Sequence, residues 1–180
     1  DHSHGTHVAG TIGATGNNAK GVVGVNWETS LMAIKFLDET RSGSICNAIQ
    51  SINYATMMNE KFDVNVLATN NSWGYYGSLN VLCDETPDVL RAAINANEIA
   101  GMLFIAAAGN GDALGRGINN DEDPRYAFYP ASAPNDNIIS VAASDLTDQL
   151  AWFSNYGATT TDIAAPGLGI LSTEPSDGYA

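Results

Sequence analysis

The sequence is poor in positive charge, and it has no long apolar run. Its 180 residues include only 7 Lys and Arg against 20 Asp and Glu, which gives a formal net charge of −13. A nucleic-acid partner is not expected, because phosphate contacts need clustered Lys and Arg. No apolar stretch reaches the roughly 18 residues that a membrane-spanning helix requires, so no membrane partner is expected either. Length and composition together predict one domain, and we expect a monomer.

Cysteine and histidine are also scarce, and the histidines are clustered. The two cysteines, Cys46 and Cys83, leave three interpretations open: one disulfide, two free thiols or two unrelated buried side chains. The only histidines are His2, His4 and His7. Their H-x-H-x-x-H spacing resembles the metal-binding motif of the metallo-β-lactamases. That motif has Asp where Thr stands here, and a zinc site needs further ligands, so zinc is the weakest hypothesis.

Apolar segments of two kinds alternate along the chain. Apolar runs predict strands at 31–37, 102–110 and 137–144, and residues 63–74 are predicted to be a strand that runs into a loop. Helical spacing and caps predict helices at 4–15 after Ser3, at 44–59, and from Thr86 and Pro87 to a stop at Gly101. This alternation predicts a parallel sheet that helices cover on both faces. Functional residues are then expected beyond the carboxyl ends of the strands, at 70–74 and 106–110.

The histidine cluster is better explained by acid–base chemistry. A histidine can serve as general base when a carboxylate orients it and a hydroxyl lies within reach. Residues 4–10, H-G-T-H-V-A-G, resemble the histidine signature of the subtilisin-like serine proteases. The resemblance makes His4 the general base, His7 an inward-facing structural residue and His2 an exposed flank.

Further segments match landmarks of the same family in order. They are G-V-V-G-V at 21–25, N-N-S-W-G at 70–74, A-A-A-G-N at 106–110, Y-P-A-S at 129–132, F-S-N-Y-G at 153–157 and A-P-G at 165–167. The resemblance implies an α/β, three-layer subtilisin-like fold with a central, mostly parallel sheet flanked by helices. It also implies that residues 1–180 are part of a single peptidase catalytic domain, incomplete at both ends.

The resemblance assigns roles to residues at the strand ends. Asn110 would donate its amide to the oxyanion. The other assigned residues would bind substrate: Ser72, Trp73 and Gly74 as the edge that pairs with an extended peptide, Ala107, Ala108 and Gly109 as the wall of the S1 pocket, Phe128 near its floor, and Ile45 as a wall of S4.

Two segments could hold a cation. Residues 14–22, A-T-G-N-N-A-K-G-V, resemble the calcium loop of the family. Asn18 would supply a side-chain oxygen, and Thr15, Lys20 and Val22 would supply carbonyls. The alternative is a Gly/Asn turn without metal. The acidic group 121–123, within the loop 109–125, is either a solvated surface or a second cation site.

Two members of the family's catalytic triad have no counterpart here. The triad runs in the order Asp, His, Ser, yet no Gly-Thr-Ser-Met-Ala segment occurs, and Asp1 lies in the wrong motif. We therefore expect an internal piece of a longer protein that is inactive alone. The complete enzyme would be a secreted, extracellular serine endopeptidase that acts on proteins or peptides and binds calcium. The alternative is a non-catalytic pseudoprotease or peptide-binding domain.

Overall fold

The computed structural model describes residues 2–78, 83 and 88–180. The chain divides into two compact units, which are treated separately below. One comprises Asp1–Ser44 and Gly169–Ala180, and the other comprises Ile45–Leu168.

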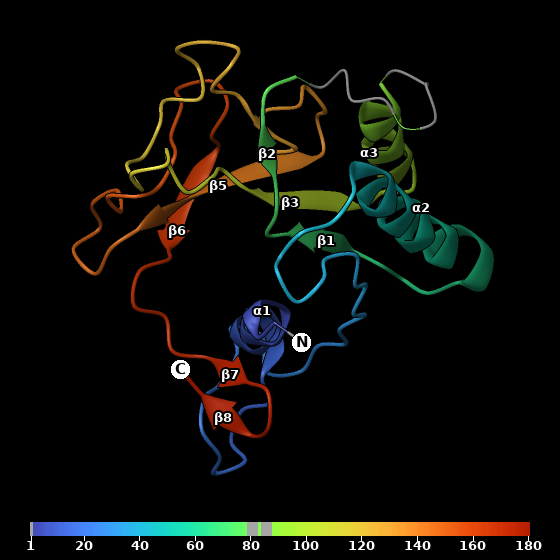
Figure 1. The fold of residues 1–180 in the computed structure, drawn as a ribbon. Coiled ribbons are helices and arrows are strands. Elements are labelled where there is room, and N and C mark those ends of the chain that lie inside the picture. The colour runs from blue at the N-terminus through green and yellow to red at the C-terminus, as the bar shows by residue number, and fades with distance from the viewer. Residues whose placement is uncertain (1, 79–82, 84–87) are drawn as a thin grey trace. The chain divides into compact units, whose positions relative to one another are not determined.

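The larger unit is built on a parallel sheet (Figure 1). Four strands lie in the order β1-β3-β5-β6, and each neighbouring pair is parallel. Their bounds are β1 Ala68–Asn71, β3 Leu103–Ala107, β5 Ile138–Ser144 and β6 Ile163–Pro166. The predicted α/β class with a mostly parallel sheet is therefore confirmed. Parallel strands place their carboxyl ends at one edge of the sheet, and the residues predicted for the site at 72–74 and 107–110 follow or end strands at this edge.

Two helices pack on the sheet of this unit. They are α2, Ile45–Phe62, and α3, Val89–Ile99. Their apolar faces meet Phe104 of β3 and Ile138 of β5 in one buried cluster. The helix predicted at 44–59 is confirmed. The predicted start of the next helix at Thr86 and Pro87 lies outside the described residues. Its stop is confirmed, because Gly101 follows α3 with φ +76.

Burial of the strands differs from the prediction. Residues of β5 alternate between buried and half-buried, and in β3 Phe104 is buried whereas Leu103 is 46% exposed. Successive side chains of a strand point to opposite faces. The buried set of β3 is the one that meets α2 and α3. In the larger unit, the face of β3 that carries Leu103 is therefore less buried than the sequence predicted.

The strand predicted at 31–37 is also wrong. None of the ladders in the described part of the chain includes these residues, and Leu31 is 47% exposed. An apolar run becomes a strand only when a neighbour accepts and donates its backbone hydrogen bonds. The parallel sheet draws all its strands from residues 68–166.

The remaining elements are short. In the larger unit, β2, Tyr75–Tyr76, pairs antiparallel with β4, Phe128–Tyr129. In the smaller unit, α1 spans His4–Gly13 and contacts β7, Thr173–Glu174, which pairs with β8, Gly178–Tyr179. The helix predicted at 4–15 is thus present. Ser3 precedes it but makes no capping hydrogen bond with its side chain.

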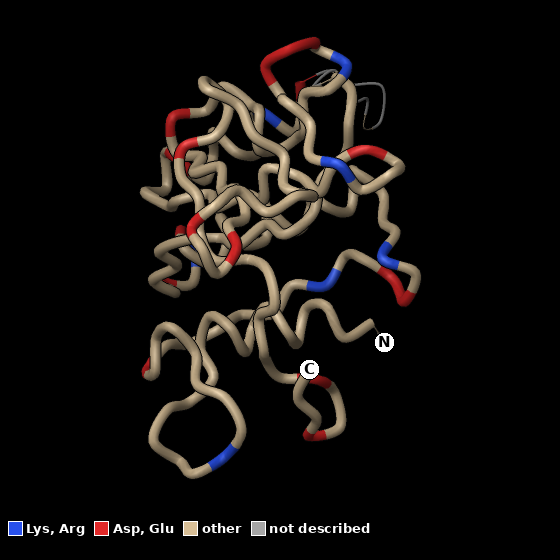
Figure 2. The backbone as a smooth tube through the Cα atoms, turned by 90° about the vertical axis from the view of Figure 1, so that its left-hand side faces the viewer, with Lys and Arg blue, Asp and Glu red and all other residues tan. Residues whose placement is uncertain are grey.

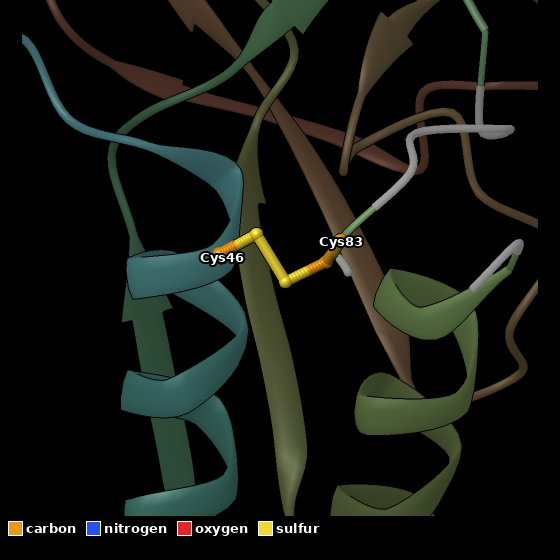
Figure 3. Close-up of a disulfide and its surroundings, with 2 residues drawn as sticks. All are labelled: Cys46 and Cys83. Atoms are coloured by element: carbon orange, nitrogen blue, oxygen red, sulfur yellow. A yellow bond between two sulfur atoms is a disulfide. The ribbon is translucent and has the colours of Figure 1, made fainter. Parts of the chain in front are cut away.

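A disulfide joins Cys46 to Cys83, which settles the question that the sequence left open (Figure 3). Cys46 lies in the first turn of α2, and the two Cα atoms are 5.4 Å apart. That separation is within the normal range for a disulfide. The bond closes a sequence separation of 37 residues, so it restricts the unfolded chain.

Charged side chains are sparse on both units. The Lys and Arg positions lie singly along the chain, and most acidic ones fall on loops (Figure 2). Ion pairs join near neighbours in sequence at Arg116 with Asp112 and at Arg125 with Asp123. Exposed pairs of this kind add little stability. Among the described helices, none is both long and apolar enough to cross a membrane.

Candidate functional site

His4 is the first residue of α1 and is exposed. Within residues 2–78, 83 and 88–180, its ring nitrogens make no hydrogen bond. Partial loss of water around the ring lowers the pKa of His4 below 6.5, and the positive charge of Arg41 lowers it further, followed by His2 and His7. A neutral imidazole at pH 7 is therefore available to accept a proton.

The other two histidines contact protein groups instead. The Nε2 atom of His7 lies 3.0 Å from the carbonyl oxygen of Ala180, and the hydroxyl of Ser172 donates to the carbonyl oxygen of His7 at 2.7 Å. His2 accepts a hydrogen bond from Arg41, with Nε and Nε2 2.6 Å apart. His7 thus ties α1 to the segment at 172–180, which is a structural arrangement.

Asn110 lies in a glycine turn just beyond the carboxyl end of β3. Its side chain is exposed, and both neighbours have left-handed backbones, with φ +118 at Gly109 and φ +85 at Gly111. A Cβ atom at Gly109 would lie 2.4 Å from the amide nitrogen of Asn155, so only glycine fits there. The turn therefore presents the Asn110 amide at the edge of the sheet.

The ring of Phe128 lies against two of the predicted substrate-binding residues. A Cβ atom built on Gly74 would lie 2.3 Å from this ring, and one on Gly109 would lie 3.0 Å from it. The ring thus packs closely against one predicted edge residue and one predicted S1 residue. Ala107 ends β3, and Ala108 is buried directly after it.

The predicted S4 and edge residues lie in the same unit. Ile45 and Trp73 both pack, half-buried, against the main apolar cluster. Ser72, Trp73 and Gly74 follow β1 without continuing it as a strand, and their conformation is held by local bonds. The indole nitrogen of Trp73 donates to Asn71 at 3.1 Å, and Asn70 donates to the Ser72 hydroxyl at 2.9 Å.

The predicted calcium ligands lie in the smaller unit. Thr15, Asn18, Lys20 and Val22 belong to a loop, 15–23, that lines an open depression of about 340 Å³. The side-chain oxygen of Asn18 accepts a hydrogen bond from the Lys20 backbone at 3.0 Å. The available ligand atoms are oxygens, as Ca²⁺ prefers. The residues therefore fit a hard cation in kind, although the loop carries no carboxylate.

The acidic side chains at 121–123 have protein partners. Asp121 accepts from the Thr159 backbone at 2.8 Å and from the Thr160 hydroxyl at 2.7 Å. The Arg125 guanidinium beside Asp123 lowers the pKa of that carboxyl to about 2. No group of three or more His, Cys, Asp or Glu side chains that could hold a metal occurs among the described residues. These observations favour a solvated loop over a second cation site.

Two buried residues next to the Asn110 turn were not predicted. Asn120 and Asn155 are 3% and 0% exposed, and both bond to this turn. The sequence held one signal for them, since Asn155 belongs to the F-S-N-Y-G landmark at 153–157. The family resemblance included this landmark but assigned no role to its asparagine.

Comparison with known proteins relates the chain to one protein family. The model of the subtilase family matches residues 1–179. The thermophilic serine proteinase of Bacillus sp. (strain AK1) is 36% identical over 179 residues, which cover 99% of this chain and 38% of that protein. Subtilisin Savinase of Lederbergia lenta is 34% identical, over 99% of this chain and 56% of that protein.

Solved structures show the same fold. The S41 psychrophilic protease superposes with a TM-score of 0.77 at 28% identity, over 99% of this chain and 56% of that one. Sphericase does so with a TM-score of 0.74 at 26% identity, over 99% of this chain and 57% of that one. The chain thus spans between about two-fifths and somewhat over half of these relatives.

Proposed function

This chain belongs to the subtilase family, and from that premise we propose that it is one segment of a secreted serine endopeptidase, called the parent enzyme below. The segment supplies the general base, His4, and the oxyanion donor, Asn110. The catalytic Asp and Ser are provided by parts of the parent enzyme outside these residues. Both compact units belong to one catalytic domain, and the family match across residues 1–179 supports this.

The proposed reaction is acyl transfer from a peptide bond. The serine hydroxyl attacks the carbonyl carbon while His4 takes its proton, and the negative charge that develops on the carbonyl oxygen is stabilised by Asn110. His4 then returns the proton to the leaving amine. The observation that carries the proposal is the Asn110 turn: an exposed amide, unbonded among the described residues, follows the end of a parallel strand.

Substrates are proteins and peptides. An extended peptide would lie along Ser72–Gly74, with its P1 side chain beside Ala107–Gly109. The ring of Phe128 packs closely against Gly74 and Gly109, so it would shorten the S1 pocket. The apolar surface of Ile45 would receive the P4 side chain. Main-chain hydrogen bonds to such an edge give affinity, and the pockets give specificity.

Two further features belong to the proposal. Calcium would be held by the Asn18 side chain and the carbonyls of Thr15, Lys20 and Val22, where it would stabilise the loop without taking part in the reaction. Secretion is supported by the Cys46–Cys83 disulfide, since such bonds persist in oxidising compartments. The parent enzyme is proposed to act as a monomer.

Activity measurements on two proteins test the proposal. The 180 residues alone should not turn over peptides, because loss of one triad member costs about 10⁴ to 10⁶ in kcat in subtilisin itself, a member of this family. The parent enzyme should be active and should react with a phosphonylating reagent directed at serine. Its His4→Ala variant should lose both properties.

The alternative function is peptide binding without catalysis. It would be supported if the parent enzyme bound peptides but lacked turnover and did not react with the reagent. Sustained, reagent-sensitive turnover by the 180 residues alone would contradict the assignment of the serine to another part of the parent enzyme.

A further inference from the structure

Polar side chains from three distant segments hold the backbone on both sides of Asn110. The side-chain nitrogen of Asn120 donates to the carbonyl oxygen of Ala108 at 2.9 Å. The backbone nitrogen of Asn155 donates to the carbonyl oxygen of Gly109 at 2.9 Å. Both bonds lie on the β3 side of the turn, and both donors are buried.

The carboxamide of Asn155 holds the other side of the turn. Its oxygen accepts from the backbone nitrogen of Gly111 at 2.8 Å and from that of Ile118 at 3.1 Å. Backbone N–H groups only donate, so these two bonds fix which end of the amide is the oxygen. The amide nitrogen then donates to Asn120 at 2.9 Å and to the Tyr76 hydroxyl at 3.0 Å.

Tyr76 closes the network. Its hydroxyl accepts from Asn155 and donates to the carbonyl oxygen of Gly111 at 2.8 Å. Every strong donor and acceptor of the Asn155 carboxamide therefore has a partner, although the residue is 0% exposed. A buried network that is fully satisfied is rigid, because any movement leaves a polar group unpaired at a cost.

We propose that Asn155, with Asn120 and Tyr76, positions the oxyanion donor. This inference rests on the proposed function of Asn110. The Asn110 side chain is exposed and makes no hydrogen bond within the described residues, so its direction follows from its backbone. The network fixes that backbone at Ala108, Gly109 and Gly111. A donor that is held in place before reaction is what stabilises a developing negative charge.

The chain offers a matched control for Asn155. Asn97 in α3 is also 0% exposed, and its amide donates to the Thr56 hydroxyl at 2.5 Å and to the carbonyl oxygen of Ile52 at 3.4 Å. It joins α3 to α2 and has no bond to the Asn110 turn. Truncation of either asparagine removes a buried amide, so both variants should lose stability.

Steady-state kinetics of the parent enzyme separate positioning from stability. Asn155→Ala should lower kcat about 10- to 100-fold with KM within about 2-fold, because misplacing a reacting group by about 1 Å costs on that order. Asn97→Ala should lower the melting temperature but leave kcat of the folded enzyme within about 2-fold. Equal kcat values for the two variants would overturn the inference.

A double variant shows whether Asn155 acts through Asn110. Adding Asn155→Ala to Asn110→Ala should lower kcat no further, since the donor is already absent, whereas independent effects would multiply and would overturn the inference. An Asn110→Ala enzyme with unchanged kcat would instead overturn the proposed oxyanion function itself.

Two milder variants, Tyr76→Phe and its control Tyr75→Phe, keep the test valid if Asn155→Ala does not fold. Tyr76→Phe removes the hydroxyl that bonds to Gly111 and to the Asn155 amide but leaves the Asn155 side chain in place, and it should lower kcat about 2- to 10-fold. Tyr75→Phe is the control on the same strand, because the Tyr75 hydroxyl bonds to Ser78 at 3.4 Å and not to the turn. Identical kcat in these two variants would contradict the positioning role.

Discussion

The Asn110 turn and the loop at 15–22 are both glycine-rich and polar, but they are held in different ways. The buried side chains of Asn120 and Asn155 and the exposed one of Tyr76 bond to the backbone around Asn110. In the loop at 15–22, Asn18 bonds only two residues away, to Lys20. Groups that act in a transition state need fixed geometry before the reaction. Protein side chains fix the geometry of the Asn110 turn, whereas we propose that a bound cation fixes the geometry of the loop at 15–22.

The largest effect should come from removing the functional group of the rigid turn. In the parent enzyme, Asn110→Ala should lower kcat about 10² to 10³-fold, the magnitude found for the corresponding donor in subtilisin, with little change in KM. The fold should survive, because the side chain is exposed. Steady-state kinetics and a thermal melt check this. A lower melting temperature with normal kcat would show that Asn110 only stabilises the turn and does not act as the oxyanion donor.

A methyl group at Gly109 should damage the turn itself. Gly109→Ala places a Cβ 2.4 Å from the Asn155 amide at φ +118, and we expect a loss of about 3 kcal/mol in unfolding free energy, the upper end for a strained residue. The control is Gly77→Ala, where φ is +129 but no atom lies within 4 Å of the new Cβ. Denaturant titration of both variants should show a smaller loss of unfolding free energy for Gly77→Ala. Equal losses would mean that the close contact with Asn155 adds nothing to the cost at Gly109.

The loop should respond to a ligand and not to its protein neighbours. Calcium at 100 times its dissociation constant should add about 2.7 kcal/mol to the stability of the parent enzyme. Thermal melts with calcium and with chelator measure this. Asn18→Ala should remove the difference. Asn26→Ala should keep it, since Asn26 makes a similar bond, to the Glu28 backbone at 3.2 Å, outside the loop. Superimposed melts of the unaltered enzyme would refute the calcium site.

The smallest effect concerns the charge around His4. The pKa of His4 is lowered first by partial loss of water around its ring and second by the charge of Arg41. The histidine can act as a base only when it is neutral. Activity should therefore be lost as pH falls through a pKa below 6.5. Arg41→Gln removes one positive neighbour, so the acidic limb of kcat/KM should move to higher pH. Lys61→Gln, with the same change of charge, should leave the limb in place; identical profiles for both would exclude a role for Arg41.

Local signals predicted what depends on local pattern. The spacing of Ile45, Ile49 and Ile52 predicted α2, and apolar runs predicted β3 and β5. The run at 31–37 failed because a strand depends on a partner that no local pattern specifies. The role of Asn155 was missed for the same reason, since its bonds to Gly111 and Ile118 join residues 44 and 37 positions apart.

The Cys46–Cys83 bond has a consequence for the proposed parent enzyme, whose copies would be possible substrates of one another. The two cysteines are 37 positions apart, so a single cut of the backbone anywhere between them leaves both pieces covalently attached. In a molecule cut between these cysteines, the disulfide would still join α2 to the segment that contains Cys83. Such a cut chain would migrate as one species on a non-reducing gel and would separate into two pieces only after the disulfide is reduced.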